Sequence, residues 1–211
     1  MIASQIEKNK IIVIVRGVAR EKLIPLAEAM YRGGIRLIEC TYDASGKISD
    51  EEIASNIGML AEHFEGKMLV GAGTVLTREQ VELTAKHGGK FIISPDTNPD
   101  IIAYTKECGL VSIPGAFTPT EAVTAHRAGA DFIKVFPVNY MGAKYIKDLK
   151  APLSHIRFLA VGGINVDNMR EYLDAGAAGV GVGSGIVDKK AIEQGDFDGV
   201  ERLARAYTQK L

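Results

Sequence analysis

Tryptophan is absent from this chain, and cysteine nearly so, with only Cys40 and Cys108 among 211 residues. The two cysteines lie far apart and form no CxxC pair, which argues against a zinc site or a disulfide framework. The net charge of −1 gives no electrostatic reason to expect nucleic acid or an anionic membrane as a partner. The sequence also lacks a stretch of ~18 apolar residues and a signal-peptide-like start, so we expect a cytoplasmic protein.

What the chain does contain is typical of a globular fold. Hydrophobic residues make up 46% and charged residues 24%. No linker, low-complexity segment or charge block marks a boundary, and the length can bury a sizeable core. We therefore predict a single domain over residues 1–211.

Short apolar runs alternate with amphipathic segments of helical length, which predicts parallel strands joined by crossover helices. Helix starts are predicted at Asp50, Thr77, Thr118 and Asn165, which are good N-caps. Eight such units in about 200 residues predict a compact (β/α)8 TIM barrel. The alternative, an open doubly wound sheet, would favour a G-x-G-x-x-G turn after the first strand, and Val15-Arg16-Gly17-Val18 has none. The eight runs are Ile11–Val15, Ile35–Cys40, Met68–Ala72, Lys90–Ile93, Leu110–Ile113, Asp131–Phe136, Arg157–Val161 and Ala178–Val182.

The sixth run places Lys134 inside an otherwise apolar strand. Lysine is rarely buried, so its presence there needs a reason. Burial disfavours the ammonium and lowers the pKa, which yields an amine that can attack a carbonyl. The alternative is a lysine at the strand end that extends to solvent.

Active sites of such barrels lie at the C-terminal ends of the strands, where Arg16 and Glu39 also fall. Alternation of side chains places Glu39 on the face of Leu37, and Lys134 on the face of Phe132 and Phe136. One acid, one lysine and one arginine would then converge on the barrel axis. A neutral lysine could form a Schiff base with a ketone while the carboxylate moves protons. The alternative is a structural ion pair between Glu39 and Lys134.

Two glycine-rich turns follow the seventh and eighth runs, where barrels often bind phosphate through backbone N–H groups. They contain Gly162 and Gly163 in the first turn and Gly183 and Ser184 in the second. Ordinary tight turns are the alternative. No metal site is predicted, because the four histidines fall away from the strand ends. Cys40 is interpreted as a packing residue, and the loop Thr41–Ser49 could either line the mouth or merely cross it.

Taken together, the motifs resemble the 2-keto-3-deoxy-6-phosphogluconate (KDPG) / 4-hydroxy-2-oxoglutarate (KHG) aldolases. The resemblance covers essentially the whole chain in order. It implies a class I, metal-free and cofactor-free aldolase on a (β/α)8 barrel, usually a homotrimer, that cleaves a 2-keto-3-deoxy sugar acid phosphate to pyruvate and glyceraldehyde 3-phosphate. The motifs are Leu37-Ile38-Glu39, Gly71-Ala72-Gly73-Thr74-Val75, Ile93-Ser94-Pro95, Pro114-Gly115 with Thr118-Pro119-Thr120-Glu121, Ile133 to Pro137, Val161-Gly162-Gly163-Ile164 and Val182-Gly183-Ser184.

The resemblance also implies roles for individual residues. Lys134 would be the Schiff-base lysine and Glu39 the acid/base. Arg16 and Thr74, with Pro95 beside them, would hold the pyruvate carboxylate. The phosphate would be bound by Gly162, Gly163, Gly183 and Ser184.

Three departures from the family pattern bear on specificity. Some members carry an arginine a few residues after the glutamate, whereas this chain reads Thr41-Tyr42-Asp43, so Arg16 would bind carboxylate alone. Where many members carry an acidic residue after the lysine strand, this chain has Asn139. A proline-threonine pair before the double glycine is replaced by Ala160-Val161, and Val161 is similar to the phosphogalactonate branch. The preferred sugar epimer therefore stays open between gluconate and galactonate types.

Two other functions stay open from the residues alone. A phosphate-binding barrel could be a sugar-phosphate epimerase or isomerase, although metal-bound histidines or paired acids are not evident at the strand ends. It could also be a non-catalytic barrel that binds a phosphorylated metabolite.

Overall fold

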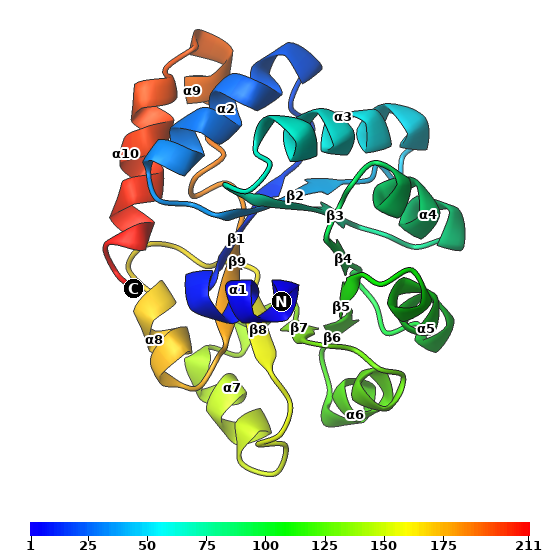
Figure 1. The fold of residues 1–211 in the computed structure, drawn as a ribbon. Coiled ribbons are helices and arrows are strands. Elements are labelled where there is room, and N and C mark those ends of the chain that lie inside the picture. The colour runs from blue at the N-terminus through cyan, green and yellow to red at the C-terminus, as the bar shows by residue number, and fades with distance from the viewer.

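A computed structural model describes residues 1–211 and forms a parallel barrel surrounded by helices (Figure 1). Each of the eight predicted runs forms a strand, which confirms the predicted (β/α)8 TIM barrel. The strands pair in the order β5-β4-β3-β2-β1-β9-β8-β7-β6, and every pair is parallel. They are β1 (Ile11–Val15), β2 (Leu37–Thr41), β3 (Leu69–Gly73), β4 (Phe91–Ile93), β5 (Val111–Ile113), β6 (Gly115–Ala116), β7 (Ile133–Val135), β8 (Phe158–Val161) and β9 (Gly179–Val182).

The additional strand, β6, is the continuation of the fifth predicted run. Pro114 has no N–H group and separates β5, which pairs with β4, from β6, which pairs with β7. The carbonyl of Pro114 still accepts the N–H of Lys134 at 2.8 Å, and the carbonyl of Ser112 accepts that of Phe132 at 3.3 Å. The two ends of the sheet therefore meet within one continuous segment and close the barrel.

The barrel interior is filled by alternate side chains of the strands, as the alternation predicts. Leu37 and Phe132 point inward, whereas Ile133 and Val135 pack outward in the larger core beneath the helices. The interior therefore holds an apolar layer below the level of Glu39 and Lys134. Its buried members are Ile6, Ile12, Leu37, Phe91, Ile93, Val111, Ile113, Phe132 and Leu159.

Helices form a ring around the strands (Figure 1). The C-terminal helix α10 (Phe197–Thr208) packs beside α2 (Arg20–Arg32). The hydroxyl of Thr208 donates to the carbonyl of Gly33, just after α2, at 2.7 Å. The surrounding helices are α2 (Arg20–Arg32), α3 (Asp50–His63), α4 (Arg78–Lys86), α5 (Pro99–Glu107), α6 (Pro119–Arg127), α7 (Ala143–Lys150), α8 (Met169–Asp174), α9 (Lys189–Gln194) and α10 (Phe197–Thr208), with a short 3-10 turn at Val138–Tyr140.

The predicted helix starts are confirmed in two cases. Thr77 caps α4, and Thr118 forms a reciprocal capping box with Glu121 at the start of α6. The other two predictions are wrong by a few residues. Ser49 rather than Asp50 caps α3, and Asn165 accepts N–H groups of a turn that precedes α8.

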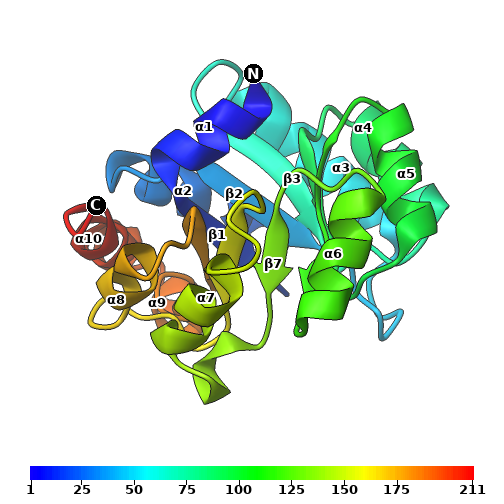
Figure 2. The same ribbon diagram turned by 90° about the horizontal axis from the view of Figure 1, so that it is seen from below.

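One further helix, α1 (Ile2–Asn9), covers the N-terminal end of the barrel. In Figure 2 the arrowhead of β7 points away from α1, which lies at the other end of the barrel. Ile6 is fully buried against the inner layer, and Arg157 stacks 4.4 Å from the Phe132 ring centre. A ligand can therefore reach the interior only from the C-terminal ends of the strands. None of the helices combines the length and apolar character needed to span a membrane.

Candidate active site

Lys134 lies in the middle of β7, and its side chain is only 8% exposed. Its Nζ atom lies 4.7 Å from the ring centre of Phe136, at the mouth of the barrel. Burial lowers the pKa of the Lys134 ammonium below its ordinary value, Glu39 opposes this shift, and the nearby Arg16 guanidinium adds to it. The structure therefore places Lys134 as a buried amine and not as a lysine that extends into solvent.

Glu39 lies in β2, is 2% exposed, and its Oε2 atom has no hydrogen-bond partner. Burial raises the pKa of this carboxyl to about 7, although Lys134 and Arg16 both act to lower it. A Cβ atom built on Gly73 would lie 2.7 Å from the Glu39 carboxyl carbon, so the glycine leaves the space that the acid occupies. Such a group can both accept and donate a proton near neutral pH.

A small cavity joins Glu39 and Lys134, with Ile14, Val161 and Gly181 also in its wall. Its volume of ≈ 10 Å³ is about the space that one water molecule needs. Glu39 and Lys134 do not form an ion pair within 4.0 Å, so the alternative of a structural ion pair is not what the structure shows. A water molecule in this cavity could carry a proton between the two groups.

Arg16 follows β1 and is exposed at the same rim. Its Nε donates to the Thr41 hydroxyl at 3.4 Å, and its Nη2 donates to the Thr74 hydroxyl at 3.3 Å. Thr74 has a φ of 57°, in the left-handed region that a β-branched residue rarely adopts. Such strain is often found at functional sites. The structure thus brings together two of the three residues predicted to bind carboxylate.

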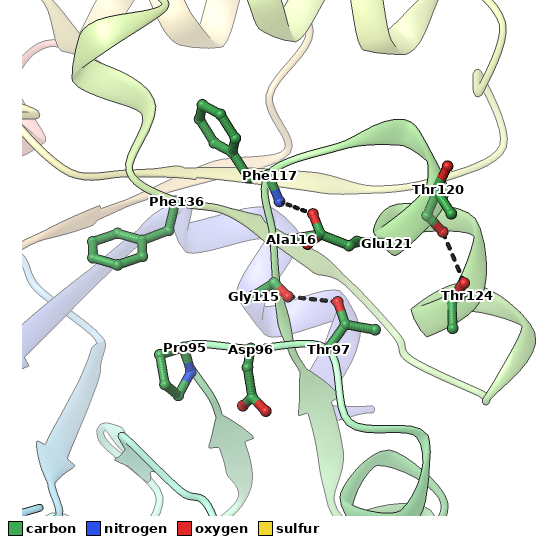
Figure 3. Close-up of a pocket in the computed structure, with 10 residues that line it drawn as sticks. All are labelled: Pro95, Asp96, Thr97, Gly115, Ala116, Phe117, Thr120, Glu121, Thr124 and Phe136. Carbon is green, nitrogen blue, oxygen red and sulfur yellow. Dashed lines mark hydrogen bonds between the residues drawn. The ribbon is translucent and has the colours of Figure 1, made fainter.

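Pro95, the third of these residues, lies two residues after the end of β4 and lines a larger outer cavity of ≈ 410 Å³ (Figure 3). Phe136 also lines this cavity, and its ring stands beside Lys134. Pro95 therefore shares this outer cavity with Phe136 and does not line the small cavity of Glu39 and Lys134. The opposite side of the cavity is formed by Glu121 and Thr124 of α6.

The two glycine-rich turns lie at the ends of β8 and β9. Gly162 and Gly163 have φ values of 105° and 69°, and a Cβ atom on Gly163 would lie 2.5 Å from that of Asn139. The backbone N–H groups of both glycines, and that of Ser184, donate no hydrogen bond within the chain. Unpaired N–H groups on neighbouring turns form an arrangement that can bind an anion.

Sequence reasoning missed the role of Thr41, which is the last residue of β2 and not part of the loop that follows. The loop itself is ordered by Asp43, whose carboxylate accepts N–H groups from Ser45, Lys47 and Ile48 at 3.0 to 3.1 Å. The only available signal for Thr41 was its position two residues after Glu39, which places both side chains on one face.

The cysteines and histidines lie outside this site. Cys40 packs in the outer core as predicted, and burial raises the pKa of its thiol to about 12. His63 contacts Glu28, and His87 contacts the carbonyl of Leu83. His126 and His155 stack against each other with ring centres 5.0 Å apart.

The fold and the site define a class: a (β/α)8 barrel with a buried lysine and a buried carboxyl of raised pKa at the C-terminal ends of its strands. The family model described as KDPG and KHG aldolase matches residues 2–203. The chain therefore belongs to the KDPG and KHG aldolase family.

Similar proteins agree with this membership. The chain is 35% identical over 178 residues to 2-dehydro-3-deoxy-6-phosphogalactonate aldolase of Escherichia coli K12, covering 84% of each chain. It is 33% identical to 2-dehydro-3-deoxy-phosphogluconate aldolase of Treponema pallidum, covering 97% of this chain and 94% of that one. The structure superposes with a TM-score of 0.87 on the KDPG aldolase of Legionella pneumophila with pyruvate captured as a covalent carbinolamine, at 27% identity over 98% of each chain.

Proposed function

We propose that this protein is a class I aldolase that cleaves a 2-keto-3-deoxy-6-phospho sugar acid to pyruvate and glyceraldehyde 3-phosphate. One observation carries the proposal: the buried Lys134 amine, with its lowered pKa, shares a cavity with the Glu39 carboxyl in a chain of this aldolase family. The captured pyruvate of the Legionella relative supports the same chemistry here.

The reaction begins when the neutral Lys134 Nζ attacks the C2 ketone of the substrate. A proton passes to the oxygen, and loss of water from the carbinolamine leaves a protonated Schiff base. The positive nitrogen withdraws electrons, so the C3–C4 bond breaks while a base removes the C4 hydroxyl proton. The aldehyde leaves, and an enamine of pyruvate remains on Lys134. Protonation at C3 and hydrolysis then release pyruvate and restore the amine.

Glu39 is the group that moves these protons in our proposal. With a pKa of about 7, roughly half of the carboxyl groups are ionised at neutral pH, so acceptance and donation are both possible. The cavity between Glu39 and Lys134 has room for about one water molecule, which would relay the proton.

The two ends of the substrate would be bound at opposite sides of the mouth. Arg16 and Thr74 would hold the pyruvate carboxylate through the arginine N–H groups and the threonine hydroxyl, with Pro95 in the wall of the outer cavity. Gly162, Gly163, Gly183 and Ser184 would bind the phosphate, supported by the unpaired backbone N–H groups of these turns.

Val161 is the residue that we propose to influence the sugar epimer. It ends β8 and lines the same cavity as Lys134, so its side chain would face the reacting carbons of a substrate bound to Lys134. Its methyl group cannot donate the hydrogen bond that a threonine would donate at this position. We therefore propose a phosphogalactonate-type preference, with 4-hydroxy-2-oxoglutarate as a further substrate cleaved to pyruvate and glyoxylate.

Four properties beyond the reaction belong to the same proposal. The chain would form a single domain and act in the cytoplasm without a cofactor, as the sequence and the family resemblance suggest. It would also assemble as a homotrimer, and the exposed apolar side chains near the mouth, among them Phe117 and Tyr140, are compatible with a contact between subunits. Light scattering would then give three times the 22.7-kDa chain mass.

The function is tested by measuring pyruvate release from each candidate substrate in an assay coupled to lactate dehydrogenase. We expect turnover of the galactonate and gluconate phosphates, and loss of turnover in Lys134→Ala. Interconversion of sugar phosphates without pyruvate release would support an epimerase or isomerase instead. Thermal stabilisation by these compounds without turnover would support a non-catalytic binding protein.

A further inference from the structure

We propose that Thr41 is a positioning residue that fixes the Arg16 guanidinium for the carboxylate of the substrate. The inference deepens the proposed function and rests on it, since it concerns the same carboxylate-binding site. Neither the motifs nor the family resemblance assigned a role to this threonine.

The geometry at the rim carries the inference. Thr41 ends β2 and is 7% exposed, and its hydroxyl accepts the Nε–H of Arg16 at 3.4 Å. Thr74, which directly follows the neighbouring strand β3, accepts the Nη2–H of the same guanidinium at 3.3 Å. Register places Thr41 directly opposite Gly73, so the two threonine hydroxyls flank the arginine from adjacent strands.

Arg16 needs such support because its side chain is exposed and long. A free arginine loses much of its rotamer freedom when it is fixed. It forms no ion pair within the chain that could hold it in place. Hydrogen bonds from Nε and Nη2 to two hydroxyls remove much of this rotamer freedom before a ligand binds. Nη1 donates no hydrogen bond within the chain and stays available to a ligand.

The support also fixes the position of the Arg16 charge, which acts on Glu39. Arg16 acts to lower the pKa of Glu39 through its charge, and a closer approach would lower it further. A guanidinium held by Thr41 and Thr74 therefore preserves a Glu39 carboxyl that can still carry a proton near neutral pH.

The test uses pyruvate, which carries the carboxylate but no phosphate. Borohydride traps the Schiff base on Lys134, and the pyruvate concentration that gives half of the maximal trapping measures binding at this end of the site. We compare Thr41→Val, which keeps the shape without the hydroxyl, with Thr41→Ser, which keeps the hydroxyl. Thr97→Val is the matched control, because Thr97 lies at the same rim and donates to a backbone carbonyl, that of Gly115, at 2.7 Å.

We expect Thr41→Val to raise the half-saturating pyruvate concentration by about fivefold to tenfold, the effect of losing one hydrogen bond of ordinary strength. Trapping at saturating pyruvate should be unchanged, and Thr41→Ser should restore binding to within about twofold of the original chain. The double variant Arg16→Ala/Thr41→Val should match Arg16→Ala alone, since Thr41 acts through Arg16.

Two results would overturn the inference: Thr41→Val binding pyruvate as tightly as Thr97→Val, or its effect adding in full to that of Arg16→Ala. A failure of the unaltered chain to be trapped at any pyruvate concentration has a different meaning. That result would refute the proposed aldolase function itself, and the inference with it.

Discussion

Replacing Glu39 by glutamine should make the protein more stable and far less active. The carboxyl is buried without a hydrogen-bond partner for Oε2, and burial raises its pKa from 4.5 to about 7. At about 1.4 kcal/mol per pKa unit, the ionised carboxylate costs roughly 3 kcal/mol of folding free energy above pH 7. Glutamine has nearly the same shape and never ionises, so it avoids this cost.

The sign of the pH dependence follows from the raised pKa. Below pH 4.5, Glu39 is protonated in both the folded and the unfolded chain, so glutamine brings no advantage. Between pH 4.5 and about 7 the unfolded chain releases its proton first, and the original protein loses stability. Above pH 7 the full difference of about 3 kcal/mol is reached and stays constant.

The assay is urea unfolding of the original chain and Glu39→Gln, at equal protein concentration, at pH 4.5 and pH 8. For a chain of this length the gain at pH 8 corresponds to a Tm about 6 to 12 °C higher. Turnover should fall by about 10² to 10⁴ because the proton-transferring group is lost. The exposed Glu65→Gln is the control for the substitution itself. An equal or lower stability of Glu39→Gln at pH 8, or a gain that does not change with pH, would refute the reasoning.

Three further predictions concern the rim of the barrel. Thr74→Gly should be about 1 kcal/mol more stable than Thr74→Ala in urea unfolding, because only glycine adopts a φ of 57° without strain, and equal stabilities would contradict the strain argument. Gly163→Ala should lower the free energy of unfolding by about 1 to 3 kcal/mol, because the residue has a φ of 69° and a new Cβ would meet Asn139. The same variant should raise KM for phosphorylated substrates but not for 4-hydroxy-2-oxoglutarate. An equal rise for both substrates would argue against a phosphate site there. Val161→Thr should shift the ratio of kcat/KM values toward the gluconate substrate by about tenfold, because the new hydroxyl would lie in the wall of the cavity beside Lys134. An unchanged ratio would show that Val161 does not determine specificity.

Much of the fold follows from local patterns in the sequence. Alternation around Phe132 and Leu37 correctly assigned the inward faces, because each strand packs on both sides and its period of two is strict. Helix α1 was not anticipated. Its single buried residue, Ile6, gives little periodic signal, and its packing surface exists only after the strands have closed. The extension of the fifth strand across Pro114 was missed for a similar reason, since pairing with β7 supplies its hydrogen bonds.

The candidate site was likewise predicted only in part from the sequence. Lys134 and Glu39 were visible as charged residues in apolar runs, and the structure confirms that both are buried. The contacts of Arg16 with Thr41 and Thr74 join segments 25 and 58 residues apart, so no local pattern encodes them. The space that Gly73 leaves for the Glu39 carboxyl likewise depends on the register between β2 and β3.

The central claim is that Lys134 is the nucleophile, and reductive trapping tests it most directly. The protein is incubated with pyruvate and borohydride, digested, and the modified peptide is identified by mass spectrometry. We predict the mass of one reduced pyruvate on Lys134 and no adduct in Lys134→Arg, because the arginine side chain stays charged at neutral pH. Absence of the adduct from Lys134, or its presence on another lysine while turnover persists, would contradict the account.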